Sequence, residues 1–312
     1  MFLKKTQVIV NPESNQGKTG KKWTQIKEML KSFLKEFKYE FTKKPLDAVN
    51  ISKAAIKDGN ELIVGVGGDG TVNEIANGFY ENNRIINPEA MLGMIPSGTG
   101  CDLSRSLKIP KGFRNALKVI TGASPWKIDV GRVCYISNEN REEERYFLNI
   151  TDFGFGGEVV EKMRQQGKKR NASSYLQCAL STFLSYKAKR LKIKVDGREL
   201  ELDDYMIGAV SNGRVFGKGM KIAPEAILDD GLFDLVLVKR MKLAEFLRNL
   251  MKLYSGTHLS HPKVMLVRGK KIEAESVDES ERVLIEVDGE QIGRLPVSFE
   301  ILPNSLPVLG SR

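Results

Sequence analysis

Apolar and polar positions in the first 125 residues follow two periods, one typical of buried strands and one typical of amphipathic helices. Short β-branched runs at Thr6–Val10 and Leu62–Val66 predict strands that are buried on both faces. Between them, the spacing predicts a helix over Trp23–Phe37, a short strand at Tyr39–Thr42 and a helix over Asp47–Lys57. Alternation of strand and helix is typical of a parallel, doubly wound α/β sheet with helices on both faces.

Two glycine-rich turns follow predicted strands of this sheet. In the first, Gly67–Gly70 separates a strand from a helix that begins at Thr71 and ends near Gly78. In the second, Pro96–Gly100 follows an apolar run and precedes a helix over Asp102–Leu107. A glycine turn between strand and helix points backbone N–H groups at an anion, and open α/β sheets bind ligands at the carboxyl ends of their strands. The two turns together therefore predict a nucleotide site.

The first glycine turn contains a carboxylate, Asp69. A carboxylate repels phosphate, so it has no use in a loop that only binds anions. We expect Asp69 to reach a Mg²⁺ ion, directly or through water, that bridges to the nucleotide. The polar loop Asn11–Lys18 follows the first strand, where a nucleotide-binding domain places its first turn. It is not a Walker A sequence, because Pro12 stands where that pattern requires glycine.

From Trp126 onward, short strand-like runs predominate, with a helix predicted over Leu243–Tyr254. Asp-Gly turn signals separate many of these runs, at residues 196–197, 230–231 and 288–289. We therefore expect two domains. The first is a nucleotide-binding α/β domain over 1–125, to which the tail 303–312 could return. The second is a mostly antiparallel β-sandwich or barrel over 126–302.

Composition narrows the class of protein. The chain has 312 residues, of which 41% are hydrophobic and 28% charged, as in a soluble globular protein. No apolar run approaches the ~18 residues of a membrane-spanning helix, and the N-terminus has no apolar core of signal-peptide length, so we expect a cytoplasmic protein. Three widely spaced cysteines without CxxC spacing, Cys101, Cys134 and Cys178, indicate neither a disulfide framework nor a zinc site.

The net charge of +10 is unevenly distributed. Ten basic residues and no Asp or Glu lie between Lys162 and Lys194, on both sides of an apolar helical segment at Tyr175–Tyr186. Basic flanks around an apolar segment suit an anionic membrane surface. Nucleic acid and a solvated helix packed on the core are the alternatives.

Four motifs, in order along nearly the whole chain, resemble the diacylglycerol kinase catalytic family. They are GGDGTVNE (Gly67–Glu74), IPSGTG (Ile95–Gly100), KIAPEAILDDGLFDLVLV (Lys221–Val238) and EVDGE (Glu286–Glu290). The resemblance is closest to the bacterial soluble lipid kinases, which share their fold with sphingosine and ceramide kinases. GGDGT alone is shared with NAD kinases and, loosely, with phosphofructokinases, whereas LDDG and DGE at this distance are far more specific to lipid kinases.

The resemblance implies two cofactors, ATP and Mg²⁺, and residues that hold them. The implied ATP-site residues are Asn11, Pro12, Ser14, Asn15, Thr42, Gly67, Gly68, Asp69, Gly70, Thr71, Asn73, Gly98 and Thr99. Asp69 would be linked to the catalytic Mg²⁺ through water. A metal site in the second domain would use the carboxylate of Asp230 and the backbone carbonyls of Ile227 and Leu232, which is an oxygen set that Mg²⁺ accepts.

The resemblance also makes Asp288 and Glu290 the candidate catalytic bases, although without it the Asp-Gly pair would be a structural turn. The base would take a proton from a lipid hydroxyl as the γ-phosphoryl group leaves ATP; we favour Asp288 and keep Glu290 as the alternative. One departure is Cys101, where family members commonly have Asn, because a thiol lacks the paired donor and acceptor of an amide.

These implications predict an ATP-dependent lipid kinase that acts on the hydroxyl of a membrane lipid. Diacylglycerol, giving phosphatidic acid, is the first candidate, and phosphatidylglycerol, sphingosine, ceramide and a soluble substrate such as NAD are the alternatives. We expect peripheral association with the inner face of the membrane, with a homodimer as an option. No nucleic-acid partner is expected, because the chain has no aromatic-rich basic strand and no helix-turn-helix.

Overall fold

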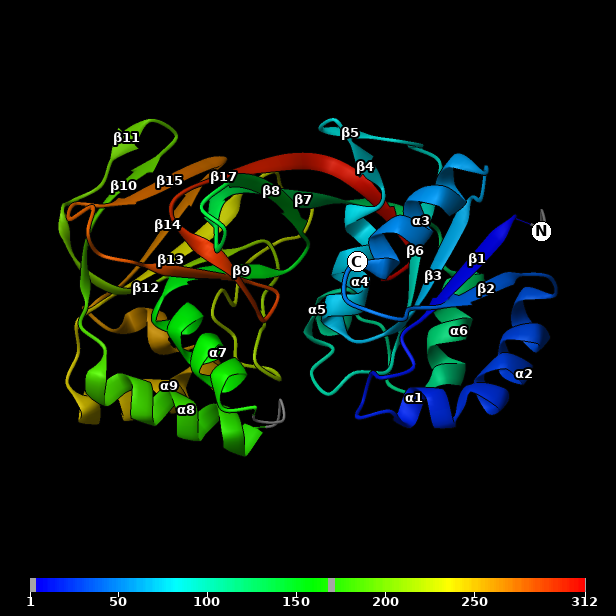
Figure 1. Ribbon diagram of the computed structural model, residues 1–312, viewed down its shortest axis with the longest axis horizontal. Coiled ribbons are helices and arrows are strands. Elements are labelled where there is room, and N and C mark those ends of the chain that lie inside the picture. The colour runs from blue at the N-terminus through cyan, green and yellow to red at the C-terminus, as the bar shows by residue number, and fades with distance from the viewer. Residues whose placement is uncertain (1–3, 168–171, 312) are drawn as a thin grey trace. The chain divides into compact units, whose positions relative to one another are not determined.

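The computed structural model describes residues 4–167 and 172–311 (Figure 1). The chain divides into two compact units: unit 1 is Met1–Val130 with Pro303–Arg312, and unit 2 is Gly131–Leu302. The passage between them lies within strand β7 (Trp126–Ser137), five residues after the boundary expected from the sequence, and again within strand β17 (Glu290–Val308). The C-terminal residues therefore belong to unit 1.

Unit 1 is built on a parallel sheet. Its strands are β1 (Thr6–Val10), β2 (Lys38–Phe41), β3 (Leu62–Gly67) and β6 (Met91–Pro96), in the spatial order β2-β1-β3-β6. The end of β17 extends the sheet, because Val308 pairs in parallel with Leu92 of β6. The chain places β2 on one side of β1 and β3 on the other, so the strand order reverses between β1 and β3.

Helices cover both faces of this sheet. They are α1 (Lys18–Lys21), α2 (Trp23–Leu34), α3 (Asp47–Lys57), α4 (Asp69–Asn77), α5 (Asp102–Ser106) and α6 (Phe113–Gly122). Two short strands, β4 (Tyr80–Glu81) and β5 (Arg84–Ile85), form a separate hairpin. A Cβ at Gly65 would meet Ile75 of α4, and one at Gly93 would meet Ile120 of α6. Because Gly65 pairs with Met94, the neighbour of Gly93, these two positions point to opposite faces.

Some element ends differ from the prediction. Helix α4 begins at Asp69, two residues early, because Gly68 is extended at the helix cap and the chain turns directly into the helix. The predicted flexible loop over Gly67–Gly70 is thus wrong in its extent, since Gly67 still belongs to β3. Helix α2 ends at Leu34 rather than Phe37, because the next residue, Lys35, has a φ of 58°.

Unit 2 is an antiparallel barrel with additional strands. Its strands are the end of β7, β8 (Glu142–Phe147), β9 (Ile150–Gly154), β10 (Lys189–Val195), β11 (Arg198–Glu199), β12 (Asp203–Ser211), β13 (Phe233–Lys239), β14 (Val264–Gly269), β15 (Lys271–Ser276), β16 (Leu284–Val287) and most of β17. Six of them pair in a closed ring, β10-β12-β9-β16-β17-β15 and back to β10. One buried cluster, which includes Phe147, Phe153, Phe233 and Phe299, forms its core. The predicted mixed α/β fold with a second, mostly antiparallel domain is confirmed.

Three helices pack on a second buried cluster of unit 2: α7 (Phe155–Gln165), α8 (Ala172–Ser185) and α9 (Leu243–Ser255), followed by a short 3-10 turn at His258–Ser260. Helix α7 was not predicted, because its first residues continue the apolar run of β9. At Gly154 the backbone takes a φ of 100°, which favours glycine, and the strand ends there. Among the helices formed by residues 4–167 and 172–311, none is long and apolar enough to span a bilayer.

Candidate active site

The predicted nucleotide-binding residues of unit 1 follow the carboxyl ends of neighbouring parallel strands. The amide of Asn11, just after β1, donates to the Val66 carbonyl of β3 over 3.0 Å, and the amide of Thr42, just after β2, donates to Val10 over 2.9 Å. Ser97, just after β6, donates its amide to the Gly67 carbonyl over 2.7 Å. These loops therefore share one edge of the sheet, beside the reversal of strand order between β1 and β3, where open α/β sheets bind ligands.

The two glycine turns touch each other. A Cβ added to Gly98 would lie 2.5 Å from the Cα of Gly68, so the two backbones approach more closely than any side chain would allow. A Cβ at Gly67 would lie 2.6 Å from the Thr71 side chain. The Asn11 side-chain amide donates to the Thr71 hydroxyl over 2.9 Å, which connects the first loop to the start of α4. The structure thus brings the predicted residues of three loops together.

A chain of hydroxyl groups connects the first loop to the second, and the sequence had indicated only part of it. The Thr19 hydroxyl lies 2.6 Å from the Ser14 hydroxyl and 2.6 Å from the Ser97 hydroxyl. Thr19 and Ser97 are buried, and neither was predicted as a site residue. The available signal was their position, since Ser97 lies inside IPSGTG and Thr19 directly follows the polar loop Asn11–Lys18.

Asp69 has a structural role that the sequence did not predict. Its carboxylate accepts the amides of Asp102 over 3.1 Å and Leu103 over 3.2 Å, one on each oxygen, at the first turn of α5. Burial raises the pKa of Asp69, while these amides favour its ionised form. Each oxygen keeps a second lone pair, so the predicted link to a metal-bound water remains compatible with this cap.

Cys101 lies between the second glycine turn and α5 in the left-handed region, with a φ of 53°. Its Sγ accepts the amide of Gly98 over 3.1 Å. The thiol therefore supplies an acceptor, as the amide oxygen of an Asn would, but it lacks the NH₂ group through which an Asn also donates. Burial, helped by the charge of Asp69, raises the pKa of Cys101 to about 11, so the thiol stays protonated at neutral pH.

The contact between the glycine turns can be tested with Gly98→Ala. Its Cβ has no room beside Gly68, so the turns must separate, and we expect KM for ATP to rise about tenfold or more. Gly122→Ala is the matched control, because no atom lies within 4 Å of its added Cβ and its φ is not positive. Steady-state kinetics and thermal unfolding of both variants check this prediction. Equal KM values for ATP in the two variants would contradict it.

The predicted metal ligands of unit 2 lie in a turn that leads into β13. The Asp230 Oδ1 accepts the amide of Leu232 over 3.1 Å, and Gly231 has a φ of 73°. The Asp230 Oδ2 is 4.0 Å from the guanidinium of Arg268, which is engaged mainly with Asp234 over 2.6 Å. Among the described residues, no group of three or more His, Cys, Asp and Glu is placed to hold a metal ion. The predicted set of one carboxylate and carbonyls remains chemically suitable for Mg²⁺.

The two candidate bases lie at a tight hairpin between β16 and β17. Val287 pairs with Glu290, and Asp288 and Gly289 have φ values of 47° and 84°, as in a two-residue type I′ turn. The amide of Asp288 donates to the Ile150 carbonyl over 3.3 Å, and the amide of Gly289 donates to a Glu286 carboxyl oxygen over 2.6 Å. The backbone amides of Asp288 and Gly289 are therefore both held, the first by β9 and the second by a side chain of β16.

One of the two candidate bases, Glu290, has a charged partner within unit 2. Glu290 forms an ion pair with Arg145 over 3.1 Å, and the Arg145 side chain is only 13% exposed. A largely buried guanidinium requires this partner, which commits the Glu290 carboxylate to a structural contact. Asp288 stays the first candidate base from the resemblance, with Glu290 as the alternative.

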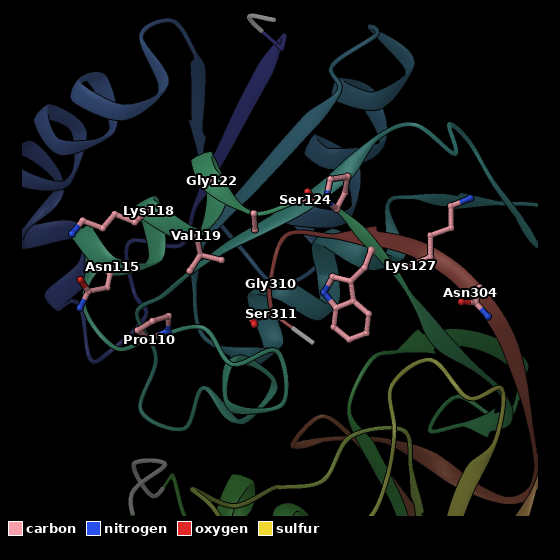
Figure 2. A pocket seen from close by; sticks show the side chains of 13 residues that line it. Pro110, Asn115, Lys118, Val119, Gly122, Ser124, Lys127, Asn304, Gly310 and Ser311 are labelled. Carbon is pink, nitrogen blue, oxygen red and sulfur yellow. The ribbon is translucent and has the colours of Figure 1, made fainter. Parts of the chain in front are cut away.

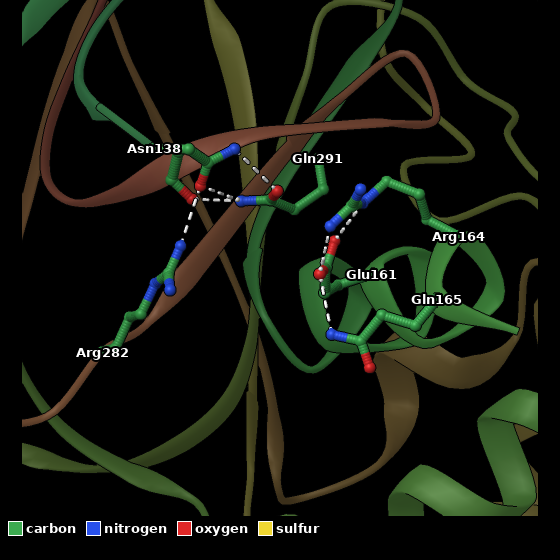
Figure 3. Close-up of polar contacts among 7 residues, drawn as sticks. Asn138, Glu161, Arg164, Gln165, Arg282 and Gln291 are labelled. Atoms are coloured by element: carbon green, nitrogen blue, oxygen red, sulfur yellow. Dashed lines mark hydrogen bonds and ion pairs between the residues drawn. The ribbon is translucent and has the colours of Figure 1, made fainter. Parts of the chain in front are cut away.

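Side chains beside the turn are also fixed by polar contacts (Figure 3). Asn138 and Gln291 exchange side-chain amide hydrogen bonds of 3.0 and 3.3 Å, and Arg282 donates to the Asn138 oxygen over 2.8 Å. These contacts connect Gln291 of β17 and Arg282, two residues before β16, to Asn138, which directly follows β7. The turn is therefore supported from both of its strands.

A separate hollow of about 1220 Å³ lies in unit 1 (Figure 2). Its walls come from α6, the segment that enters β7 and the C-terminal tail, and they include Lys118, Trp126, Lys127 and Gly310. None of the predicted nucleotide or metal ligands lines it. This hollow is therefore distinct from the candidate active site.

Two family models match the chain. The diacylglycerol kinase catalytic domain matches residues 5–133, and the YegS C-terminal NAD kinase beta sandwich-like domain matches residues 150–310. A curated diacylglycerol kinase of Staphylococcus carnosus (strain TM300) is 29% identical over 312 residues, covering 98% of this chain and 94% of the relative. One of Staphylococcus aureus (strain MRSA252) is 30% identical over 313 residues, covering 98% and 92%.

Solved structures agree with these matches. A Bacillus anthracis protein described as a candidate diacylglycerol kinase superposes with a TM-score of 0.78 at 26% identity, covering 99% of this chain and 95% of that one. Yeast NADH kinase, solved with NADH, superposes with a TM-score of 0.56 at 11% identity, covering 100% and 85%. The second likeness is one of fold alone.

Proposed function

Because this chain belongs to the diacylglycerol kinase family and is an ATP-dependent kinase of that family, we propose that it phosphorylates diacylglycerol at a membrane surface. The reaction gives phosphatidic acid and ADP. The observation that supports a lipid acceptor, as opposed to a soluble one, is the set of apolar side chains exposed on helices α8 and α9 of unit 2.

In the proposed reaction, each unit has its own task. Unit 1 binds ATP through the loops after β1, β2, β3 and β6, with the N-terminus of α4 favouring phosphate. Asp288 of unit 2 accepts the proton of the lipid hydroxyl. As the O–H bond breaks, the hydroxyl oxygen bonds to the γ-phosphorus, and ADP leaves with the electrons of the broken P–O bond. Asp288 need not be a strong base, because positioning supplies much of the barrier reduction in a loose phosphoryl transfer.

Mg²⁺, when bound, would neutralise charge on the transferred phosphoryl group. We expect Asp69 to position a water of the ion that accompanies the nucleotide. We expect Asp230, with the carbonyls of Ile227 and Leu232, to hold a second ion. All of these donors are oxygen atoms, which is the ligand type that Mg²⁺ prefers.

Helices α8 and α9 carry the proposed membrane face. On α9, an exposed apolar stripe with helical spacing consists of Leu243, Leu247, Met251 and Tyr254. On α8, Leu176 and Leu184 are exposed. The two helices pack together through Phe183 and Phe246, whose ring centroids are 4.5 Å apart. Leu184 and Met251 are 77% and 70% exposed, which is unusual for large apolar side chains unless they bind a partner.

The basic stretch contributes less charge to this face than the sequence suggested. Figure 3 shows the Arg164 guanidinium, which donates two hydrogen bonds of 2.7 Å to the Glu161 carboxylate. Four more of its ten basic residues form ion pairs with acidic residues: Lys189, Arg190, Lys192 and Lys194. Lys168, Lys169 and Arg170 lie outside the described residues. Arg248 and Lys252, beside the apolar stripe of α9, are further cations that suit an anionic surface.

The membrane face predicts a loss of vesicle binding in Met251→Glu and Leu184→Glu. A charge placed in an apolar stripe opposes burial in the headgroup region, and we expect the bound fraction to fall about fivefold or more. Co-sedimentation with vesicles of phosphatidylglycerol and phosphatidylcholine measures this. Leu46→Glu, which changes an exposed leucine of unit 1, is the control. If all three variants bind as the wild type does, the α8–α9 face is not the docking surface.

The substrate is tested by transfer of radiolabelled γ-phosphate from Mg²⁺-ATP in mixed micelles. Diacylglycerol, phosphatidylglycerol, ceramide and sphingosine are presented in parallel, and NAD is presented in solution. We expect label in diacylglycerol. Label in another lipid would replace the substrate and keep the class of reaction, whereas label only in NAD would overturn the proposal of a lipid kinase.

A further inference from the structure

Two acidic residues lie directly opposite each other on neighbouring strands of the unit 2 barrel. Asp152 of β9 is the register partner of Glu286 of β16, and the two side chains are only 4% and 5% exposed. Opposite positions in an antiparallel pair place side chains on one face, and like charges there are destabilising. Two ionised carboxylates in a buried site would be more costly still, so this arrangement requires an explanation.

Compensating charge is not the explanation. Among the described residues, neither carboxylate forms an ion pair with a Lys, Arg or His. The two carboxyl groups lie on facing positions of neighbouring strands in a buried site. Two ionised carboxylates in such a site would repel each other and lose their hydration, which favours a state in which one of them carries a proton.

We propose that Asp152 and Glu286 share one proton and act as a positioning pair for the turn that carries Asp288. The inference rests on the proposed function, in which Asp288 accepts the proton of the substrate. Neither residue of the pair is proposed to touch the substrate.

The contacts of the pair lead in two directions. Glu286 accepts the amide of Gly289, which adjoins Asp288, over 2.6 Å. Asp152 lies against the first turn of α7. A Cβ at Gly156 would lie 2.0 Å from an Asp152 oxygen, so the helix approaches this carboxyl as closely as glycine permits. The pair therefore connects the Asp288 turn to the start of α7.

Titratable groups around the pair favour retention of the proton. Burial raises the pKa of Asp152 to about 7 and raises the pKa of Glu286 well above its usual value, with the charges of Asp152 and Asp288 adding to the second effect. From the helical side, Tyr175 and Tyr186 face the carboxyls, with Tyr254 beside Tyr175, and the pKa values of Tyr175 and Tyr186 are raised by burial. These phenols therefore stay neutral and add no negative charge near the pair.

The shared proton gives the turn a dependence on pH. While the pair holds its shared proton, at most one of its carboxyls is charged, and Glu286 accepts the Gly289 amide. When the last proton leaves at alkaline pH, two like charges oppose each other and the support of the turn weakens. We expect kcat to fall as pH rises through this titration, while KM for ATP, which depends on unit 1, stays constant.

Amide variants separate a shared proton from simple packing. Asp152→Asn replaces one carboxyl of the pair by an amide that cannot titrate and can donate to Glu286, so we expect a neutral-pH kcat within about threefold of the wild type and loss of the alkaline fall. Glu286→Gln keeps an acceptor for the Gly289 amide, whereas Glu286→Ala removes it. We expect kcat to fall at least tenfold more in the alanine variant than in the glutamine variant, with KM for ATP unchanged.

Two readouts are independent of catalysis. The infrared spectrum of the wild type at pH 7 should show the C=O stretch of a buried, protonated carboxylic acid, and Asp152→Asn should remove it. Because the pKa of the pair is higher in the folded than in the unfolded state, wild-type stability should fall as pH rises above about 4 and until the last proton has left, and this fall should shrink in Asp152→Asn.

Each outcome has one meaning. An infrared band that persists in Asp152→Asn, an alkaline fall of kcat that persists in it, or equal kcat values for Glu286→Gln and Glu286→Ala would overturn the proposal. If the wild type phosphorylates no lipid, the proposed function fails, but the infrared band and the pH dependence of unfolding still decide whether the pair shares a proton.

Discussion

Asp288→Asn is expected to lower kcat by about 10²–10⁴-fold, the range associated with loss of a general base. Asn has nearly the shape of Asp and tolerates the left-handed backbone that Asp288 adopts, so the hairpin should keep its conformation. KM for ATP should stay within about threefold, because the nucleotide is bound by residues of unit 1. Steady-state kinetics with the lipid identified by the transfer assay measures both quantities.

Glu290→Gln is the matched control for this prediction. It removes the ion pair with Arg145 and leaves that arginine, whose side chain is only 13% exposed, without a charged partner. We expect a loss of stability of about 1–3 kcal/mol, as for a poorly compensated buried charge, with a decrease in kcat of less than about tenfold. If Glu290→Gln lost more kcat than Asp288→Asn, the assignment of the base would be reversed.

Asp69→Asn is expected to lower kcat/KM for ATP by about 100-fold, as for a misplaced catalytic group. An Asn side chain offers one acceptor, so it cannot receive the amides of both Asp102 and Leu103. The second glycine turn would lose its connection to the first, and the nucleotide-associated ion would lose a carboxylate. Titration with ATP, followed by kinetics and urea unfolding, measures the two effects separately.

Asp47→Asn is the control for loss of a capping carboxylate. Asp47 begins α3 and accepts the amides of Lys43 and Lys44 over 2.7 and 3.1 Å, both on one oxygen, so it is another carboxylate that accepts two backbone amides, away from the two glycine turns. We expect its kcat/KM for ATP to equal that of the wild type. If Asp69→Asn behaved in the same way and lost only stability, Asp69 would be a structural cap and not part of the nucleotide site.

Local pattern was sufficient for the elements that depend on it. The runs at Thr6–Val10 and Asp47–Lys57 form a strand and a helix with the predicted bounds, because buried β-branched runs and a 3.6-residue period are properties of neighbouring residues. The turn at Asp288-Gly289 was also readable, since two positive φ values favour that pair. The strand-then-helix order alone predicts that both glycine turns lie at one edge of the sheet.

Boundaries decided by a single backbone residue were less predictable. The apolar run that forms β9 continues into α7 without a polar break, and only the φ of 100° at Gly154 separates them. Similarly, Gly68 turns the chain directly into α4, so Asp69 lies in the helix and reaches the amides of α5. Periodicity does not report the backbone angle of one glycine, and these contacts follow from that angle.

The sequence by itself determined the fold class, the two glycine turns and the position of the Asp288 hairpin, because these follow from short-range pattern and motif spacing. Only the tertiary structure decided which charges meet. It neutralises Arg164 and four residues of β10 with acidic partners, and it gives Glu290 to Arg145. It also sets Asp152 opposite Glu286 across two strands. Strand register and burial control such pairings, and both arise only when distant segments of the chain pack together.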